Sequence, residues 1–313
     1  MARITVLPNG VTASCPRYGP LAAEPPKRGR IGGWSTQATR RLRRWFYSVD
    51  GAALSLYGDG YAFTLTVRDL PPSSGDWTRT RRSFVERMGR RGMVACQWLT
   101  EWQRRGVPHL HGIVYFDPGV VVKRRGRVVP AAEVVTSSWM RAAVKWGPGE
   151  RSQHVQAVWG LPGWLQYQAK HSVRGVGHYQ RANLPEAWQG ASGRLWGTLG
   201  AWPVREQLAE VDMRTFHRFR RLMRRWLVAE ARGRGDYRRL AWLRRMLADP
   251  EPLRSAVRAV GEFCPEELSR ELLLAAAEGD LEVADQLVGG VVPIGAEDGS
   301  VEVNGHQAEV SWK

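Results

Sequence analysis

Cysteine is scarce in this sequence, and long apolar runs are missing from it. The three cysteines, Cys15, Cys96 and Cys264, lie far apart and never form a C-x-x-C pair, which argues against a disulfide framework and against a cysteine zinc site. No run approaches ~18 apolar residues, and the first residues lack the apolar core of a signal peptide. We therefore expect a soluble, cytoplasmic protein with no membrane partner.

A nucleotide-binding G-x-x-x-x-G-K-[ST] motif is also missing, so no ATP-driven helicase is expected in this chain. Acidic residues are few before residue 249: residues 1–248 hold 42 Lys and Arg against 16 Asp and Glu, whereas residues 249–313 hold 4 against 14. The net charge of +16 and the 15 tryptophans are typical of a protein that binds a phosphate backbone and stacks on bases. The alternative is arginine drift on the surface of a protein from an arginine-rich genome.

Composition and periodicity divide the chain into four parts. Residues 1–34 are rich in Pro and Gly without periodicity, and a short helix is expected after Ser35 or Thr36. The four predicted parts are a basic, partly disordered N-terminal arm over 1–50, an enzymatic domain over 51–200, a basic helical region over 201–248 and an acidic C-terminal tail or small subdomain over 249–313.

Strand-like and helical segments alternate in the second of these parts. The predicted strands cover 60–69, 92–103, 107–116 and 154–160, and the predicted helices cover 76–91, with Asp76 as N-cap, 131–146 and 163–174. This order predicts an α+β fold in which helices flank a central antiparallel sheet. A mainly helical C-terminal region follows, with long basic helices over 204–247.

Two histidines stand at the head of one of these strands, in the sequence VPHLHGIVYF (107–116). Successive side chains of a strand alternate between its faces, so His109 and His111 point the same way, roughly 6 to 7 Å apart. Such a pair can bind one metal ion. On the spacing alone, two polar residues on the wet face of a half-buried strand are an equally good interpretation.

Three motifs follow one another in a fixed order: FTLT (63–66), EWQRRGVPHLHG (101–112) and YQAKHSVR (167–174). Together they resemble the HUH superfamily of single-strand endonucleases, in particular the rolling-circle replication initiators of phages and plasmids. The resemblance covers residues 55–185. It implies an enzyme that nicks and rejoins single-stranded DNA at an origin through a 5′-phosphotyrosine intermediate.

The resemblance also implies a metal site and a nucleophile. Glu101, His109 and His111 correspond to the ligands of a divalent metal, Mg or Mn, although ligand softness alone would favour Mn, Zn or Ni. Tyr167 corresponds to the nucleophile. Lys170 lies one helical turn later, where its ammonium group would lower the pKa of the phenol from its ordinary value near ~10.

The third motif departs from the two-tyrosine pattern Y-x-x-K-Y-x-x-K that some relatives carry. Here His171 replaces the second tyrosine and Arg174 the second lysine, which indicates a single catalytic tyrosine, with Tyr179 as the next candidate. The tyrosine follows the histidines, as in replication initiators, whereas in conjugative relaxases it precedes them. The residues expected to contact DNA are Thr64, Thr66, Arg104, Arg105 and Arg174.

The expected partners are single-stranded origin DNA and a host helicase and polymerase. Two other functions stay open at this stage. A single-tyrosine transposase would use the same chemistry at the same residues. A basic nucleic-acid-binding protein without enzymatic activity would explain the charge but not the ordered motifs.

Overall fold

The computed structural model describes residues 1–15, 29, 31–58, 60–117, 123–124, 127–128, 130–172, 174–248, 260–280 and 286–287. The chain forms two compact units. One unit combines residues 1–22 with residues 205–313, and the other consists of residues 23–204. All residues of the predicted metal and nucleophile site lie in the second unit.

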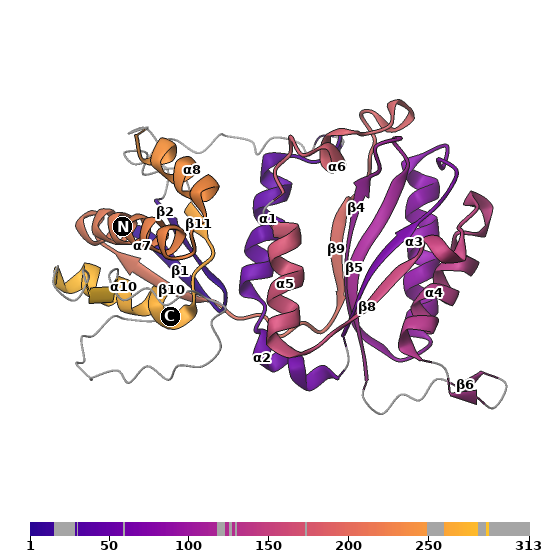
Figure 1. Ribbon diagram of the computed structural model, residues 1–313, viewed down its shortest axis with the longest axis horizontal. Helices are drawn as coiled ribbons and strands as arrows, with labels where there is room; N and C mark the ends of the chain where they lie inside the picture. Colours follow the sequence, from indigo (N-terminus) through magenta and orange to yellow (C-terminus); the bar gives the residue numbers. More distant parts are fainter. Residues whose placement is uncertain are drawn as a thin grey trace. The chain divides into compact units, whose positions relative to one another are not determined.

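A five-stranded antiparallel sheet is the centre of the second unit (Figure 1). Its strand order is β8-β3-β5-β4-β9, so the histidine strand β5 lies in the middle. Every residue of β5 is buried, which explains why its sequence is an almost continuous apolar run. The strands are β3 (Gly60–Thr66), β4 (Met93–Trp102), β5 (Pro108–Phe116), β8 (His154–Val158) and β9 (Trp196–Gly200).

Helices cover both faces of this sheet (Figure 1). On one face, α3 (Ser74–Gly89) and α4 (Ala131–Ala142) pack through edge-to-face aromatic contacts, in which Phe84 meets both Phe63 and Trp139. On the other, α1 (Thr36–Ser48) and α5 (Gly160–Ser172) meet where Phe46 contacts Trp164 and Tyr167. The short elements are α2 (Gly51–Leu54), α6 (Tyr179–Ala182), 3-10 turns at Ser55–Tyr57, Val144–Trp146, Glu150–Ser152 and Glu186–Trp188, and the pair β6 (Lys123–Arg124) and β7 (Arg127–Val128).

This architecture confirms the predicted α+β fold with a central antiparallel sheet and flanking helices. The N-cap of α1 is Ser35, as expected, and its hydroxyl accepts a hydrogen bond from Ala38 N at 3.1 Å. The predicted Asp76 cap is wrong. Ser73, three residues earlier, has the extended backbone of a cap and accepts from Asp76 N, while the Asp76 carboxylate accepts from the Ser73 hydroxyl, so the two form a capping box.

The first unit corrects two expectations. Residues 2–14 are not an irregular arm but a hairpin of β1 (Ala2–Leu7) and β2 (Gly10–Ser14), and the segment expected to begin a helix at residue 204 contains a strand, β10 (Gln207–Val211). β1 pairs with β10, and β2 pairs with β11 (Val260–Glu262). These strands are stabilised by partners some 200 residues away, which local periodicity cannot reveal.

The helical C-terminal region is present in the first unit. It contains α7 (Met213–Gly233), α8 (Tyr237–Ala248) and α10 (Glu266–Glu278). Leu272 and Leu273 of α10 are fully buried in the core of this unit, so this part of the acidic segment is not a solvated tail. Of the acidic segment, residues 249–259, 281–285 and 288–313 lie outside the described residues.

Candidate functional site

Two adjacent strands bring the three predicted metal ligands together. In the register of β4 and β5, Glu101 lies opposite His109 and Leu99 lies opposite His111. The ligand atoms of Glu101, His109 and His111 all lie within 4.8 Å of one another. His111 Nε2 is 3.2 Å from His109 Nε2 and 3.5 Å from the Glu101 carboxylate. The predicted common face of the two imidazoles is therefore confirmed.

Close packing next to the histidines requires a glycine. A Cβ atom at Gly112 would collide with the ring of Phe63 on β3 and with the backbone carbonyl of Gln97 on β4. Gly112 thus lets the neighbouring strands approach β5 beside His111.

A threonine on β3 orients one imidazole. Thr64 pairs with His111 in the sheet, and its hydroxyl lies 2.9 Å from His111 Nδ1. This contact engages Nδ1 and leaves Nε2 directed at the cluster. A metal-binding histidine is typically oriented in this way, by a hydrogen bond to the ring nitrogen that does not face the metal. Thr66 pairs with His109 in the same way, but its hydroxyl donates to Ser152 O at 3.3 Å.

The cluster is buried, and burial decides its protonation. Desolvation, helped by the positive charges of Arg174 and Lys170, lowers the pKa of His109 to about 4. Burial also holds the pKa of His111 well below its ordinary value. Both imidazoles are therefore neutral near pH 7 and can offer a lone pair to a cation. Two neutral imidazoles and one carboxylate fit a divalent metal and leave coordination positions for a phosphate oxygen and water.

Two arginines bind the carboxylate of this cluster. Arg181 Nε donates to Glu101 Oε1 at 3.1 Å, and Arg174 Nη1 donates to Glu101 Oε2. Arg181 is only 2% exposed and is itself held by the His171 carbonyl, to which its Nη2 donates at 3.0 Å. Arg174, expected to contact DNA, thus neutralises Glu101 in this structure.

Arg181 and Gln180 of α6 were not predicted as site residues. Gln180 is buried, and its side-chain Nε2 lies 3.4 Å from His109 Nε2. Their stretch, YQRA, matches none of the three motifs and reaches the site only because α6 packs on β4. Sequence spacing gave no signal for either residue.

Tyr167 lies in the core rather than at the cluster. It is 7% exposed, and its hydroxyl donates to Gln97 Oε1 at 2.7 Å. Gln97 precedes Glu101 by four residues on β4, which places it about 13 Å further along the strand. The ring of His171 lies between Tyr167 and the cluster. Its centroid is 4.8 Å from that of Tyr167 and 5.1 Å from that of His111.

The expected effect of Lys170 on this phenol is wrong. Burial raises the pKa of Tyr167 well above its ordinary value, and the nearby Cys96 and Glu101 raise it further. Lys170 is exposed, whereas Tyr167 faces the sheet. The helix thus buries the phenol and leaves the ammonium group on its exposed side.

Comparison with known proteins identifies relatives. The chain is 43% identical over 253 residues to the "Putative replication protein" of Xylella fastidiosa, covering 77% of this chain and 84% of that protein. It is 40% identical over 263 residues to the replication-associated protein of Pseudomonas phage Pf3, covering 82% of this chain and 91% of that protein. This chain belongs to that family of replication proteins. No family model matches it, and no solved structure matches it significantly.

Two exposed basic residues of this replication protein lie in the turn between β4 and β5. Arg104 and Arg105 are both exposed. Arg105 donates to Val67 O at 2.8 Å, and the guanidinium of Arg104 lies 5.4 Å from the ring centroid of Tyr179. Arg104 and Tyr179, with Ala182 and Asn183, line a cavity of about 490 Å³. An arginine beside an exposed tyrosine can contact a phosphate and stack on a base.

The described part of this replication protein contains no helix with the length and hydropathy that a bilayer crossing requires.

Proposed function

We propose that this replication protein starts rolling-circle replication by nicking and rejoining single-stranded DNA at an origin, as an HUH-type endonuclease. The observation that carries the proposal is the convergence of Glu101, His109 and His111 within 4.8 Å, on adjacent strands, in a family of replication proteins. A binding protein without enzymatic activity would not need two neutral imidazoles beside a buried carboxylate. Relatives named for replication favour this function over transposition.

Glu101, His109 and His111 would hold the divalent cation, Mg or Mn. When bound, the cation would polarise a phosphate oxygen and offset the negative charge that develops on it. Thr64 would fix the ring of His111. Arg174 and Arg181, which bind Glu101 in this structure, would turn part of their charge toward the phosphate.

Tyr167 is the proposed nucleophile. Its phenolic oxygen forms a bond to phosphorus, the bond from phosphorus to the 3′-oxygen breaks, and the phenolic proton ends on that oxygen. The products are a 5′-phosphotyrosine and a free 3′-hydroxyl. Attack by a 3′-hydroxyl in the reverse direction reseals the strand, and because the phosphotyrosine keeps the energy of the broken bond, ATP is not needed.

The buried phenol sets a condition on this reaction. Tyr167 must leave Gln97 and turn toward the cluster before it can reach a phosphate, so we propose that DNA binding displaces α5. Lys170, exposed at rest, would approach the phosphate in the displaced helix. The free 3′-hydroxyl would serve a host polymerase in the cytoplasm, with unwinding by a host helicase.

Nicking of single-stranded origin DNA from the protein's own replicon tests the proposal. The unaltered protein should cut with Mg or Mn and not with EDTA, and should form a covalent adduct with the 5′ end that the nick creates. His109→Ala should lower the cutting rate by ~10² or more. His154→Ala, which removes an exposed histidine from β8, is the matched control and should cut normally. Equal cutting by the two variants would refute the metal assignment.

A further inference from the structure

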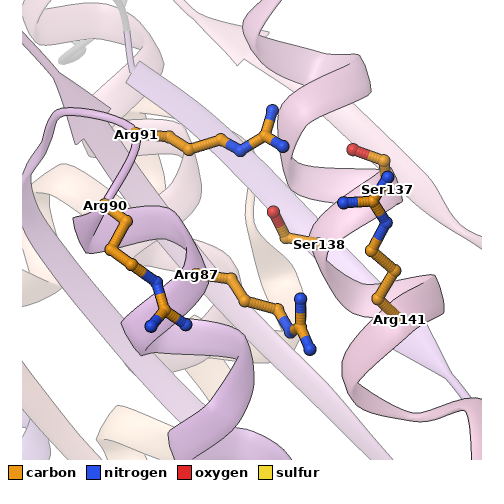
Figure 2. A pocket seen from close by; sticks show the side chains of 6 residues that line it. All are labelled: Arg87, Arg90, Arg91, Ser137, Ser138 and Arg141. Atoms are coloured by element: carbon orange, nitrogen blue, oxygen red, sulfur yellow. The ribbon is translucent and has the colours of Figure 1, made fainter. Parts of the chain in front are cut away.

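A second basic site lies on the opposite face of the sheet, between α3 and α4 (Figure 2). It is a cavity of about 280 Å³. Among the described residues, the side chains that line it are arginine or serine: Arg87, Arg90, Arg91, Ser137, Ser138 and Arg141. The Glu101 cluster faces α5 instead, because His171 of that helix packs on His111. The sheet therefore separates this cavity from the cluster.

The arginines of this cavity have no carboxylate partner of the kind that several other arginines of the protein have. Within the described residues, Arg79, Arg174, Arg181, Arg234 and Arg270 each form a salt bridge with a carboxylate. Across those same residues no carboxylate reaches salt-bridge distance of the four arginines that line the cavity. Four like charges are thus gathered without a counter-charge from the described protein.

One of these arginines is also incompletely hydrogen-bonded. Arg87 Nε is buried and has no partner among the described groups. A buried donor without an acceptor costs free energy, more so when it carries charge. Figure 2 shows the guanidinium groups of Arg87, Arg91 and Arg141 pointing toward the space beside Ser137 and Ser138. An anion in that space would satisfy the buried donor and reduce the repulsion.

Helix dipoles give only a partial alternative explanation. Arg87 lies in the last turn of α3 and Arg141 in the last turn of α4, where a cation is favoured. The helix dipole favours a cation at the end of each helix separately. It does not explain why arginines from two helices line the same cavity. It also does not explain the buried, unpartnered Nε.

We propose that this cavity binds the backbone phosphates of DNA, at a place distinct from the cleavage site. Guanidinium forks and serine hydroxyls are the side-chain groups that contact phosphate oxygens most often. The described residues of the lining include no aromatic ring on which a base could stack, so we expect the contact to be independent of sequence. The identification of the anion as DNA rests on the proposed function. The binding of phosphate groups by the cavity rests only on its arginine and serine side chains.

Binding of a non-origin oligonucleotide, single-stranded or duplex, by the full chain tests this. Arg87→Gln/Arg141→Gln removes two cavity arginines, and Arg82→Gln/Arg151→Gln removes two exposed arginines as the matched control. At ~50 mM salt the cavity variant should bind about tenfold more weakly than the control, and the slope of log affinity against log salt should fall by ~1 to 2. Equal affinities and slopes for the two variants would overturn the proposal.

Two further measurements address misfolding of the Gln variant and binding of a small anion in place of DNA. Arg87→Lys/Arg141→Lys keeps the charge and loses the forks, so its affinity should lie between those of the parent and the Gln variant even if the Gln variant folds poorly. Pyrophosphate should raise the melting temperature of the parent more than that of the Arg87→Gln/Arg141→Gln variant, because the cavity takes phosphate groups. If it does so while DNA binding by the cavity variant equals the control, the cavity takes a small anion and the DNA proposal is wrong.

The same variants separate this proposal from the proposed function. Arg87→Gln/Arg141→Gln should cut a short oligonucleotide that covers only the nick site at the parent's rate. His109→Ala should lose cutting and keep the salt slope of the parent. A cavity variant that loses cutting of the short oligonucleotide but keeps parental non-origin binding would contradict a separate backbone site.

Discussion

The hydroxyl of Tyr167 on α5 donates a hydrogen bond of 2.7 Å to the side-chain oxygen of Gln97 on β4, inside the core of the second unit. The partner nitrogen of that amide, Gln97 Nε2, is buried without a described partner. The phenol of the candidate nucleophile thus has one described hydrogen bond, and Phe46, Trp164 and His171 pack around its ring. This arrangement keeps the phenol protonated and away from water.

Replacing this hydroxyl separates chemistry from binding. Tyr167→Phe should abolish the nick and the covalent protein–DNA adduct while single-strand affinity stays within about twofold, since one hydroxyl is lost. The free energy of unfolding should fall by ~1 to 2 kcal/mol, because Gln97 Oε1 is left without a donor. Gel analysis of the adduct and urea unfolding measure the two effects. Tyr179→Phe is the control, and an adduct that survives in Tyr167→Phe but not in Tyr179→Phe would move the nucleophile to Tyr179.

Thr64 and Thr66 provide a matched pair on one strand. Thr64→Val should weaken binding of Mn by about 10- to 100-fold, because the hydroxyl that orients His111 is lost. Thr66→Val removes a hydroxyl that bonds to Ser152 O instead and should change metal affinity little. Calorimetric titration of both variants with Mn measures the difference. Equal losses of Mn affinity in the two variants would show that the Thr64 hydroxyl does not orient the His111 ring for metal binding.

Stability of the metal-free protein should fall in mild acid. The folded-state pKa of His109 is about 4, below its ordinary value, so between that value and ~6.5 the unfolded chain binds more protons than the folded chain. The free energy of unfolding therefore has its full value above pH ~6.5. It decreases as the pH falls toward 4, by up to ~1.4 kcal/mol per pH unit for each such histidine. Buried His111 and His171, whose pKa values are also lowered, add to the slope.

Urea unfolding in EDTA at pH 7 and pH 5 measures this dependence. His109→Asn should show a shallower loss of stability between these pH values than the parent. His154→Asn, at an exposed position, should match the parent. A parent protein equally stable at both pH values would contradict the lowered pKa of the buried imidazoles.

The acidic segment should matter to folding. Leu273→Ala in α10 should lower the free energy of unfolding by ~2 to 5 kcal/mol, because a fully buried leucine leaves a cavity. Glu278→Ala, in the last turn of the same helix, should change it by less than ~0.5 kcal/mol. Thermal and urea unfolding compare the two. A Leu273→Ala protein as stable as the parent would show that α10 does not contribute to the core.

The buried position of α10 limits how the charge asymmetry of the chain can be tested. Removing residues 249–313 as a whole would delete β11 and α10 along with the acidic charges, so the deletion cannot isolate the electrostatic effect of the tail. Reversing charges at exposed positions, such as Glu278→Lys, keeps the core and changes only the charge.

Sequence patterns predicted four of the five strands in the sheet of the second unit and the shared face of His109 and His111, but not β9. Alternation along a strand fixes that His109 and His111 share a face, and the short turn between β4 and β5 fixes that Glu101 lies opposite His109. Both relationships are local, so residue spacing is enough to predict them. The capping of α1 by Ser35 is local in the same sense.

The surroundings of Glu101, His109 and His111 follow from tertiary packing instead. Arg181 and Gln180 reach the cluster because α6 packs on β4, and Tyr167 bonds to Gln97 because α5 turns its apolar side toward the sheet. The hairpin of β1 and β2 depends on β10 and β11, and the arginine cavity depends on the packing of α3 against α4. Contacts between segments distant in the chain arise from shape, burial and charge in three dimensions, which no local pattern encodes.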